Sequence, residues 1–177
     1  MLYGNPDVTG VERTFREDEI IVSKTDLDGK ITYGNRTFFK LADMAEKNCL
    51  NTQHNVVRHP NMPRTVFDLL WQTIKDGKEI FAYVMNRSSN GDHYWVFAHV
   101  TPSRDSSGNV IGYHSNRRVP NRQPLDEHII PLYKKILDAE KNASSPKDAI
   151  IAGNKIVNDL LTEKRSKFNE LMFALGV

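Results

Sequence analysis

The sequence predicts an α+β fold in which helices cross one face of a five-stranded antiparallel sheet. Three observations lead to this prediction. Two short β-branched segments come first, a segment with helical periodicity follows, and three longer segments of alternating hydrophobicity come after it. Glycine-containing turns separate the segments that are expected to pair as hairpins. This order is typical of an antiparallel sheet whose helices gather on one side.

The first hairpin is predicted at residues 19–23 and 30–33. Both segments are rich in β-branched residues, and the DLDG sequence at 26–29 between them is a turn signal. Asn35 comes directly after the hairpin, where its side chain can cap a short helix. Residues 48–62 have no sustained period, so they predict a polar loop or one-turn helices.

A longer helix is expected to begin at Pro63, because proline is well tolerated at the first helical position. Gly77 is expected to end it. The apolar residues of its buried side follow a helical period: Val66, Leu69, Leu70 and Ile74. Alternation then predicts three strands at residues 80–86, 93–101 and 110–116.

Two more helices are predicted after the sheet. Pro131 restricts the first of them to a start near residue 129. Ser145 can cap the second, which begins at Pro146 and keeps a four-and-three spacing of apolar residues as far as Leu175. This spacing fits a coiled-coil or docking seam, and it equally fits a helix that packs back on its own domain. We therefore divide the chain into a leader or cap at 1–18, a central domain at 19–119 and a helical extension at 120–177.

Composition excludes several classes of protein. The chain of 177 residues is 39% hydrophobic and 26% charged, as in soluble globular proteins, and its net charge of +2 gives no nucleic-acid footprint. No apolar stretch approaches the roughly 18–20 residues of a membrane span, and the first residues lack a secretory signal, so a cytoplasmic protein is expected. The single cysteine, Cys49, excludes an internal disulfide.

The sequence contains no recognisable catalytic pattern. Its six histidines have no metal-ligand spacing, and we find neither a nucleophile elbow nor a phosphate-binding glycine loop. The sequence therefore does not predict an enzyme.

Residues 55–63, NVVRHPNMP, are the segment most suggestive of binding. They place the Arg58 guanidinium, the His59 imidazole and two carboxamides just before a helix N-terminus, an arrangement that suits an anionic or heteroaromatic ligand. Trp71 and Trp95 offer flat apolar surfaces for a ring. Composition alone favours a plainer interpretation, in which this segment is a polar connection that caps the next helix.

The segment NVVRHPNMP resembles the N-[MIV]-[VI]-R-H-P-D-M-P signature of the PAS domain in the bacterial aerotaxis and energy-taxis receptor family. The similarity continues through KDG at 75–77 and NRSSNGDHYWV at 86–96. The resemblance implies a PAS fold for the central domain, acting as a sensor that binds FAD noncovalently. The family's flavin-site residues correspond to these positions: Asn35, Arg58, His59, Asn61 and Trp71.

The resemblance also implies a role for individual residues. Arg58 is expected to pair with the pyrophosphate or a flavin carbonyl, Trp71 to contact the ring system, and Asn35 to hydrogen-bond a heteroatom. Two positions depart from the family pattern. Asn61 replaces the usual aspartate, which removes a charge, and Ile80 stands where the family has a second tryptophan.

The chain resembles the stand-alone PAS half of bipartite energy-taxis systems, because it ends at Val177 with no membrane anchor. This resemblance implies signalling in trans to a membrane chemoreceptor with a HAMP segment and a methyl-accepting domain. The flavin's redox state would report electron-transport status. We also expect a homodimer, without nucleic-acid binding or direct membrane insertion, and association with a membrane only through the receptor.

Of three alternatives to a flavin redox sensor, the first is disfavoured and the other two remain open. A light-sensing LOV-type domain is suggested by Asn48-Cys49, but Cys49 precedes the reactive position, so a buried structural thiol is expected. A haem-binding PAS gas or redox sensor would use His54 or His59 as an axial ligand. The third alternative is a PAS interaction module without a cofactor.

Overall fold

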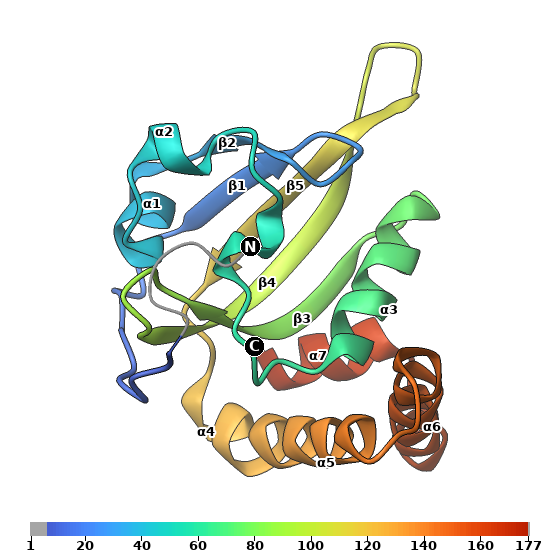
Figure 1. Cartoon of the computed structure of the whole chain (residues 1–177). Coiled ribbons are helices and arrows are strands. Elements are labelled where there is room, and N and C mark those ends of the chain that lie inside the picture. The colour runs from blue at the N-terminus through green and yellow to red at the C-terminus, as the bar shows by residue number, and fades with distance from the viewer. Residues whose placement is uncertain (1–6, 177) are drawn as a thin grey trace.

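The protein forms one five-stranded antiparallel sheet with helices on both of its faces, in a computed structural model that describes residues 7–176. The strand order is β2-β1-β5-β4-β3. The strands are β1 (Ile21–Thr25), β2 (Ile31–Gly34), β3 (Ile80–Arg87), β4 (His93–Arg104) and β5 (Val110–Arg118). The predicted fold class is confirmed, and Figure 1 shows the turn between β4 and β5 projecting from the sheet.

The helices between β2 and β3 lie on one face of the sheet (Figure 1). They are α1 (Arg36–Ala42), α2 (Glu46–Cys49), the 3₁₀ helix η1 (His54–Val57) and α3 (Arg64–Lys75). The expectation of one-turn helices within 48–62 is therefore correct. Asn35 caps α1 as predicted, because its Oδ1 accepts the amide hydrogen of Phe38 at 3.0 Å.

Helix α3 begins at Arg64, one residue later than predicted. Pro63 has a ψ of 137°, which is extended, so it occupies the cap position and not the first turn. Along α3, Val66, Leu70 and Ile74 are buried, as their spacing predicts. Leu70 and Ile74 also form a smaller core cluster with three residues of the sheet: Ile80, Val100 and Tyr113.

Two short helical segments precede the first predicted C-terminal helix. The helical path starts with α4 (Arg122–Pro124), continues through a π-helical turn, η2 (Leu125–Ile129), and becomes α5 (Ile130–Lys141). The amide of Ile130 donates to the carbonyl of Leu125, five residues back. The α-helix α5 itself begins at Ile130 with Pro131 in its first turn, in agreement with the predicted start near residue 129.

The prediction of one helix from 146 to 175 is wrong. Helix α6 (Pro146–Lys164) is capped by Ser145 as expected, but Arg165 has a left-handed φ of 49° and ends it. Helix α7 (Phe168–Gly176) then packs against β3. Burial explains the break, because the turn lets Met172 reach the core, where it is 0% exposed.

The C-terminal helices cover the β3 edge of the sheet (Figure 1). On α7, Asn169 accepts the Phe81 amide at Oδ1, at 2.9 Å, and donates from Nδ2 to the Glu79 carbonyl at 2.8 Å. On α5, the Tyr133 hydroxyl donates to the Tyr83 carbonyl at 2.7 Å. Of the two arrangements that the spacing allowed, the helices therefore adopt the one packed back on the sheet.

The leader follows the turn between β3 and β4. The Arg13 amide donates to the His93 carbonyl at 2.7 Å, and the Arg13 guanidinium pairs with Asp92 at 2.9 Å. Residues 1–6 of the predicted leader lie outside the described residues. Among residues 7–176, no helix is both long enough and apolar enough to cross a bilayer.

Asn169→Ala is expected to lower the free energy of unfolding by about 1–2 kcal/mol, because two hydrogen bonds to β3 are lost and each contributes about 1 kcal/mol. Asn158→Ala on the exposed face of α6 is the control and should change it by less than about 0.5 kcal/mol. Urea denaturation of both variants measures the difference. Equal midpoints for the two would show that Asn169 does not hold α7 to the sheet.

Candidate functional site: a polar-based cavity between α3 and the sheet

A cavity of about 1020 Å³ lies between α3 and the inner face of the sheet. Its volume is at the upper end of the range of about 300–1,000 Å³ that is typical of small-molecule pockets. Apolar side chains from α3 and from β3 and β4 form much of its wall: Phe67, Leu70, Ile74, Val84, Ala98 and Val100. Polar groups lie at its base and its rim, so the cavity has two chemically different ends.

A buried guanidinium lies at the base of the cavity. Arg117 of β5 is 3% exposed, and its Nη2 donates to Ser23 Oγ and, at 2.9 Å, to His54 Nε2. The guanidinium carbon is also 5.5 Å from the centre of the Phe38 ring, which is a cation–π distance. None of these partners is a carboxylate, so the positive charge of Arg117 is not neutralised by them.

Burial and hydrogen bonding determine the protonation states of Arg117 and His54. Burial lowers the pKa of Arg117 to about 10, so the guanidinium stays charged at neutral pH. Burial and then the charge of Arg117 lower the pKa of His54 to about 3. Because a guanidinium only donates, His54 Nε2 must accept, and His54 is therefore the neutral Nδ1–H tautomer.

Two residues that line the cavity have buried polar atoms without a hydrogen-bond partner among the described residues. These atoms are Thr25 Oγ1 and Arg117 Nη1. A buried polar group without a partner costs about 1–3 kcal/mol. Thr25 and Arg117 therefore give the cavity lining hydrogen-bonding capacity that the fold does not use.

Trp71 forms a rigid wall of the cavity. Its ring packs edge-on against Tyr113, with 5.6 Å between the ring centres. On its other side lies the β1–β2 turn, where a Cβ at Gly29 would be 2.8 Å from the Trp71 ring, so only glycine fits there. Lys75 lies 5.7 Å from the ring centre. Trp71 is therefore held in place by its neighbours.

Arg58 lies at the cavity rim. Its guanidinium carbon is 4.5 Å from the centre of the Phe67 ring, and its backbone bridges to Asn86 of β3. Burial and then the charge of Arg64 lower the pKa of Arg58. With Lys75 and Arg117, these arginines give the cavity lining four cationic side chains, against two carboxylates, those of Asp28 and Asp68. The rim therefore suits the anionic part of a ligand.

The predicted site residues do not all meet at the cavity. Arg58 and Trp71 line it, whereas Asn35, His59 and Asn61 are not among its lining residues. Besides capping α1, Asn35 joins the helix to β1: its Oδ1 also accepts the Val22 amide at 3.1 Å. This position in the fold gives Asn35 a structural role.

His59 and Asn61 shape the turn that leads into α3. His59 is 4% exposed, and its Nδ1 accepts the amide hydrogen of Asn61 at 3.1 Å. Burial, followed by His93 and Arg87, lowers the pKa of His59 to about 4. Asn61 itself is exposed. Within residues 7–176, no group of three or more metal-ligating side chains is arranged to hold an ion.

Ser23, Thr25 and Arg117 line the cavity but were not predicted as site residues, and Trp95 lies away from it. Strand alternation contained the signal for Arg117, because Tyr113, Ser115 and Arg117 occupy every second position of β5 and all line the cavity. In β4, alternation of the same kind places Trp95 on the face of the sheet opposite the cavity.

Trp95 and Cys49 lie elsewhere in the fold. The Trp95 ring packs against Tyr133 of α5, with 6.2 Å between the ring centres. Trp95 therefore cannot share a ligand with Trp71. Cys49 of α2 is fully buried, as expected, and burial raises the pKa of its thiol. It is not among the residues that line the cavity.

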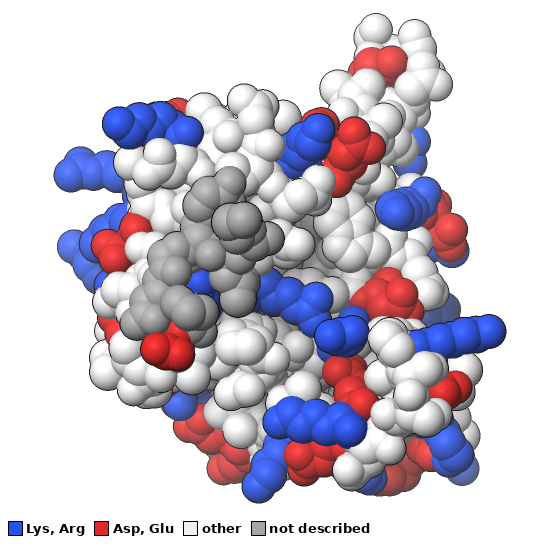
Figure 2. Space-filling model, in the orientation of Figure 1, with Lys and Arg blue, Asp and Glu red and all other residues white. Residues whose placement is uncertain are grey.

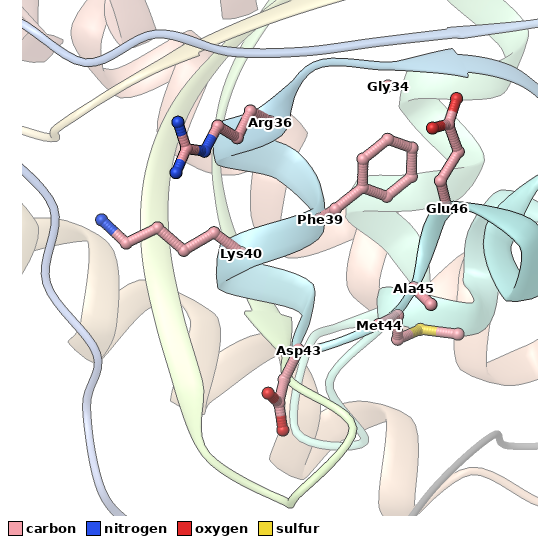
Figure 3. A pocket seen from close by; sticks show the side chains of 8 residues that line it. All are labelled: Gly34, Arg36, Phe39, Lys40, Asp43, Met44, Ala45 and Glu46. Atoms are coloured by element: carbon pink, nitrogen blue, oxygen red, sulfur yellow. The ribbon is translucent and has the colours of Figure 1, made fainter.

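A second hollow, of about 730 Å³, lies over α1 and the start of α2. Figure 3 shows Arg36 and Lys40 extending to one side of α1, whereas Asp43 points downward and Glu46 lies on the opposite side. They do not converge on a common point, so this hollow offers no organised set of polar groups to a ligand. Figure 2 shows acidic and basic side chains mixed over the visible face, with no broad patch of one sign.

Comparison with known proteins gives the class of the chain. Residues 31–117 match the family described as the PAS fold. A light-oxygen-voltage domain studied with a flavin analogue has the same fold, with a TM-score of 0.56 and 16% identity over 66% of this chain and 87% of that one. The dark structure of the photoreceptor Aureochrome1 LOV gives a TM-score of 0.55 and 19% identity, covering 66% and 85%. The chain therefore contains a PAS domain.

Sequence relatives narrow the class further. Over 133 residues the chain is 38% identical to the aerotaxis receptor of Escherichia coli (strain K12), covering 73% of this chain and 25% of the receptor. It is 24% identical over 99 residues to the nitrogen fixation regulatory protein of Klebsiella pneumoniae, covering 56% of this chain and 20% of that protein. The chain thus spans a quarter or less of these relatives, and its PAS domain is of the aerotaxis-receptor type.

His54 is expected to remain neutral, as the Nδ1–H tautomer, from about pH 8 down to about pH 5. The unfolded chain takes up this proton near pH 6.5, whereas the folded His54 has a pKa of about 3. Its contribution to stability is therefore fully present above pH 6.5 and is lost as the pH falls toward 3. Long-range proton–nitrogen NMR spectra check the protonation state. An imidazolium signal from His54 at about pH 6 would exclude the proposed tautomer.

Proposed function

We propose that the chain is a cytoplasmic redox or energy sensor that binds FAD noncovalently in the cavity between α3 and the sheet. The observation that supports this best is the charged base of the cavity, where the buried Arg117 has a nitrogen that finds no partner within residues 7–176. A flavin combines a polar edge of acceptor atoms with an apolar edge, which matches a cavity with a polar base and apolar walls.

The residues of the cavity divide naturally among the parts of such a ligand. Arg117 and Thr25 suit the polar edge of the ring system, because both are polar residues that line the cavity. Trp71 and Phe67 supply ring surfaces along the wall, and Arg58 at the rim suits a phosphate. When bound, FAD supplies reversible electron uptake, and the surrounding hydrogen bonds respond to the accompanying change of charge.

A haem-binding sensor is less well supported by the geometry. Coordination of iron requires a histidine nitrogen directed at the metal. The Nε2 of His54 already accepts a hydrogen bond from Arg117 at 2.9 Å, and His59 is not among the residues that line the cavity. Neither histidine presents a free nitrogen to the cavity, so flavin is favoured over haem.

The absorbance spectrum of the purified protein distinguishes the candidates. Bands near about 370 and 450 nm indicate flavin, whereas one intense Soret band indicates haem. A colourless protein that does not take up added FAD would contradict the redox-sensor proposal. Such a protein would instead belong to the third class, PAS modules that bind partners without a cofactor.

We infer further that the sensor signals, in a taxis response, to a separate membrane chemoreceptor with a HAMP segment and a methyl-accepting domain. We also propose that it acts as a homodimer and that it is not an enzyme. The 38% identity to the aerotaxis receptor supports the signalling context. Helices 120–177, at the β3 edge, are the proposed output element. Co-purification of the full chain and of a chain truncated after about residue 140 with a candidate receptor tests this assignment. Equal recovery of the receptor with both would contradict it.

Arg58→Ala and Trp71→Ala are each expected to weaken FAD binding by roughly tenfold or more, because each removes a contact of about 1.4 kcal/mol or more. Arg36→Ala, an arginine of the second hollow on α1, is the matched control and should leave binding unchanged. Fluorescence quenching during titration with FAD measures the affinities. If both cavity variants bound FAD as tightly as the wild type, the proposed site would be wrong.

A further inference from the structure

The end of α5 supplies the cap of α3. The Glu140 side chain is 8% exposed and accepts from the Arg64 amide at 2.9 Å, the Thr65 amide at 2.8 Å and the Thr65 hydroxyl at 2.8 Å. The first amides of a helix have no partner within it, and a carboxylate there is favourable. Pro63, at the cap position, makes no side-chain capping bond. A residue 75 positions away from Thr65 therefore performs this role.

Helix α6 meets α3 at the same point. A Cβ placed on Gly153 would lie 1.9 Å from Thr65 Oγ1 and 3.1 Å from Ile136 Cγ2, so the α6 backbone lies directly against α3 and α5. One turn earlier, on the same side of α6, Ile150 is among the residues that line the cavity. Its neighbour Ile151 is 57% exposed. The helical extension thus contributes part of the cavity wall.

The charge of Glu140 also reaches the cavity rim. Among the causes that act on the pKa of Arg58, burial and Arg64 lower it, and the Glu140 carboxylate raises it. Arg58 lines the cavity, whereas Glu140 holds the helix next to it. Glu140 is therefore close enough to the cavity rim to influence one of the residues that line it.

We propose that Glu140 and Ile150 make the C-terminal helices part of the ligand site, so that filling the cavity and docking α5 and α6 on α3 stabilise each other. This inference rests on the proposed binding of FAD. Helix α3 is the shared element, because its N-terminus is held by Glu140 while Phe67 and Trp71 line the cavity. Such a coupling is reciprocal: whatever factor docking adds to FAD affinity, FAD adds to docking.

Amide hydrogen exchange of the protein without added FAD tests the cap itself. Glu140→Gln should speed exchange of the Arg64 and Thr65 amides by about tenfold, because a neutral amide accepts more weakly than a carboxylate. Asp138→Asn removes the same charge from an exposed position of α5 and should match the wild type. Unchanged exchange at both amides in Glu140→Gln would overturn the role of Glu140.

FAD titration tests the coupling with a matched pair of neighbouring residues. Ile150→Ala and Glu140→Gln should each weaken FAD binding by about three- to tenfold, whereas Ile151→Ala should bind as the wild type does. FAD should in turn slow amide exchange in α5 and α6 of the wild type by a similar factor. Ile150→Ala leaves the Glu140 cap intact, so it provides a test even if Glu140→Gln is poorly folded.

The outcomes separate this inference from the proposed function. Equal FAD affinity in all variants, without protection of α5 and α6, would overturn the coupling and leave FAD binding intact. If the wild type does not bind FAD, both the proposed function and its coupling to the helices are wrong. Weaker binding of Ile150→Ala than of Ile151→Ala, together with FAD-dependent protection, supports the coupling.

Discussion

The burial of one positive charge constrains the inner face of the sheet. A guanidinium inside a protein is expensive unless its hydrogen bonds are satisfied, and Arg117 obtains its partners from two separate elements: Ser23 on β1 and His54 on η1. The short helix η1 must therefore stay against β1 and β5, and His54 must stay neutral to accept. This arrangement gives the cavity its polar end, and the apolar end follows from the packing of α3 on the sheet.

The two walls of the cavity differ in how they are held. The sheet wall depends on backbone ladders between neighbouring strands, which are continuous and cooperative. The α3 wall packs on the sheet through apolar side chains, and its N-terminal end also depends on the Glu140 carboxylate of α5 and on close contact with the backbone of α6. Side-chain contacts of this kind can be lost without unfolding the sheet, so the helical wall is the part of the cavity that can respond. This division suits the proposed sensor, in which a stable scaffold must pass a change to other elements.

The features predicted from the sequence are the local ones. The β1–β2 hairpin, the Asn35 cap and the buried face of α3 each depend on residues within a few positions of one another, so composition and period reveal them. The base of the cavity depends on pairs far apart in sequence, such as Arg117 with Ser23, 94 positions away, which no local pattern contains. The break at Arg165 was not predicted for the same reason, because it depends on a contact between residues far apart in sequence. The four-and-three spacing continues through it, and only the contact of α7 with β3 ends the helix.

The cover on β3 has a consequence for assembly. An edge strand with free amides and carbonyls recruits strands from other molecules, and proteins avoid this by covering or charging such edges. Here the side-chain amide of Asn169 makes the hydrogen bonds to Phe81 and Glu79 that a sixth strand would otherwise make. The Tyr133 hydroxyl does the same at the Tyr83 carbonyl. While α5 and α7 are docked, two copies of this domain cannot merge their sheets through β3. Release of these helices would expose unpaired amides and carbonyls on β3, which can pair with strands of other molecules. The solubility of the protein therefore depends on the docking of its own C-terminal segment.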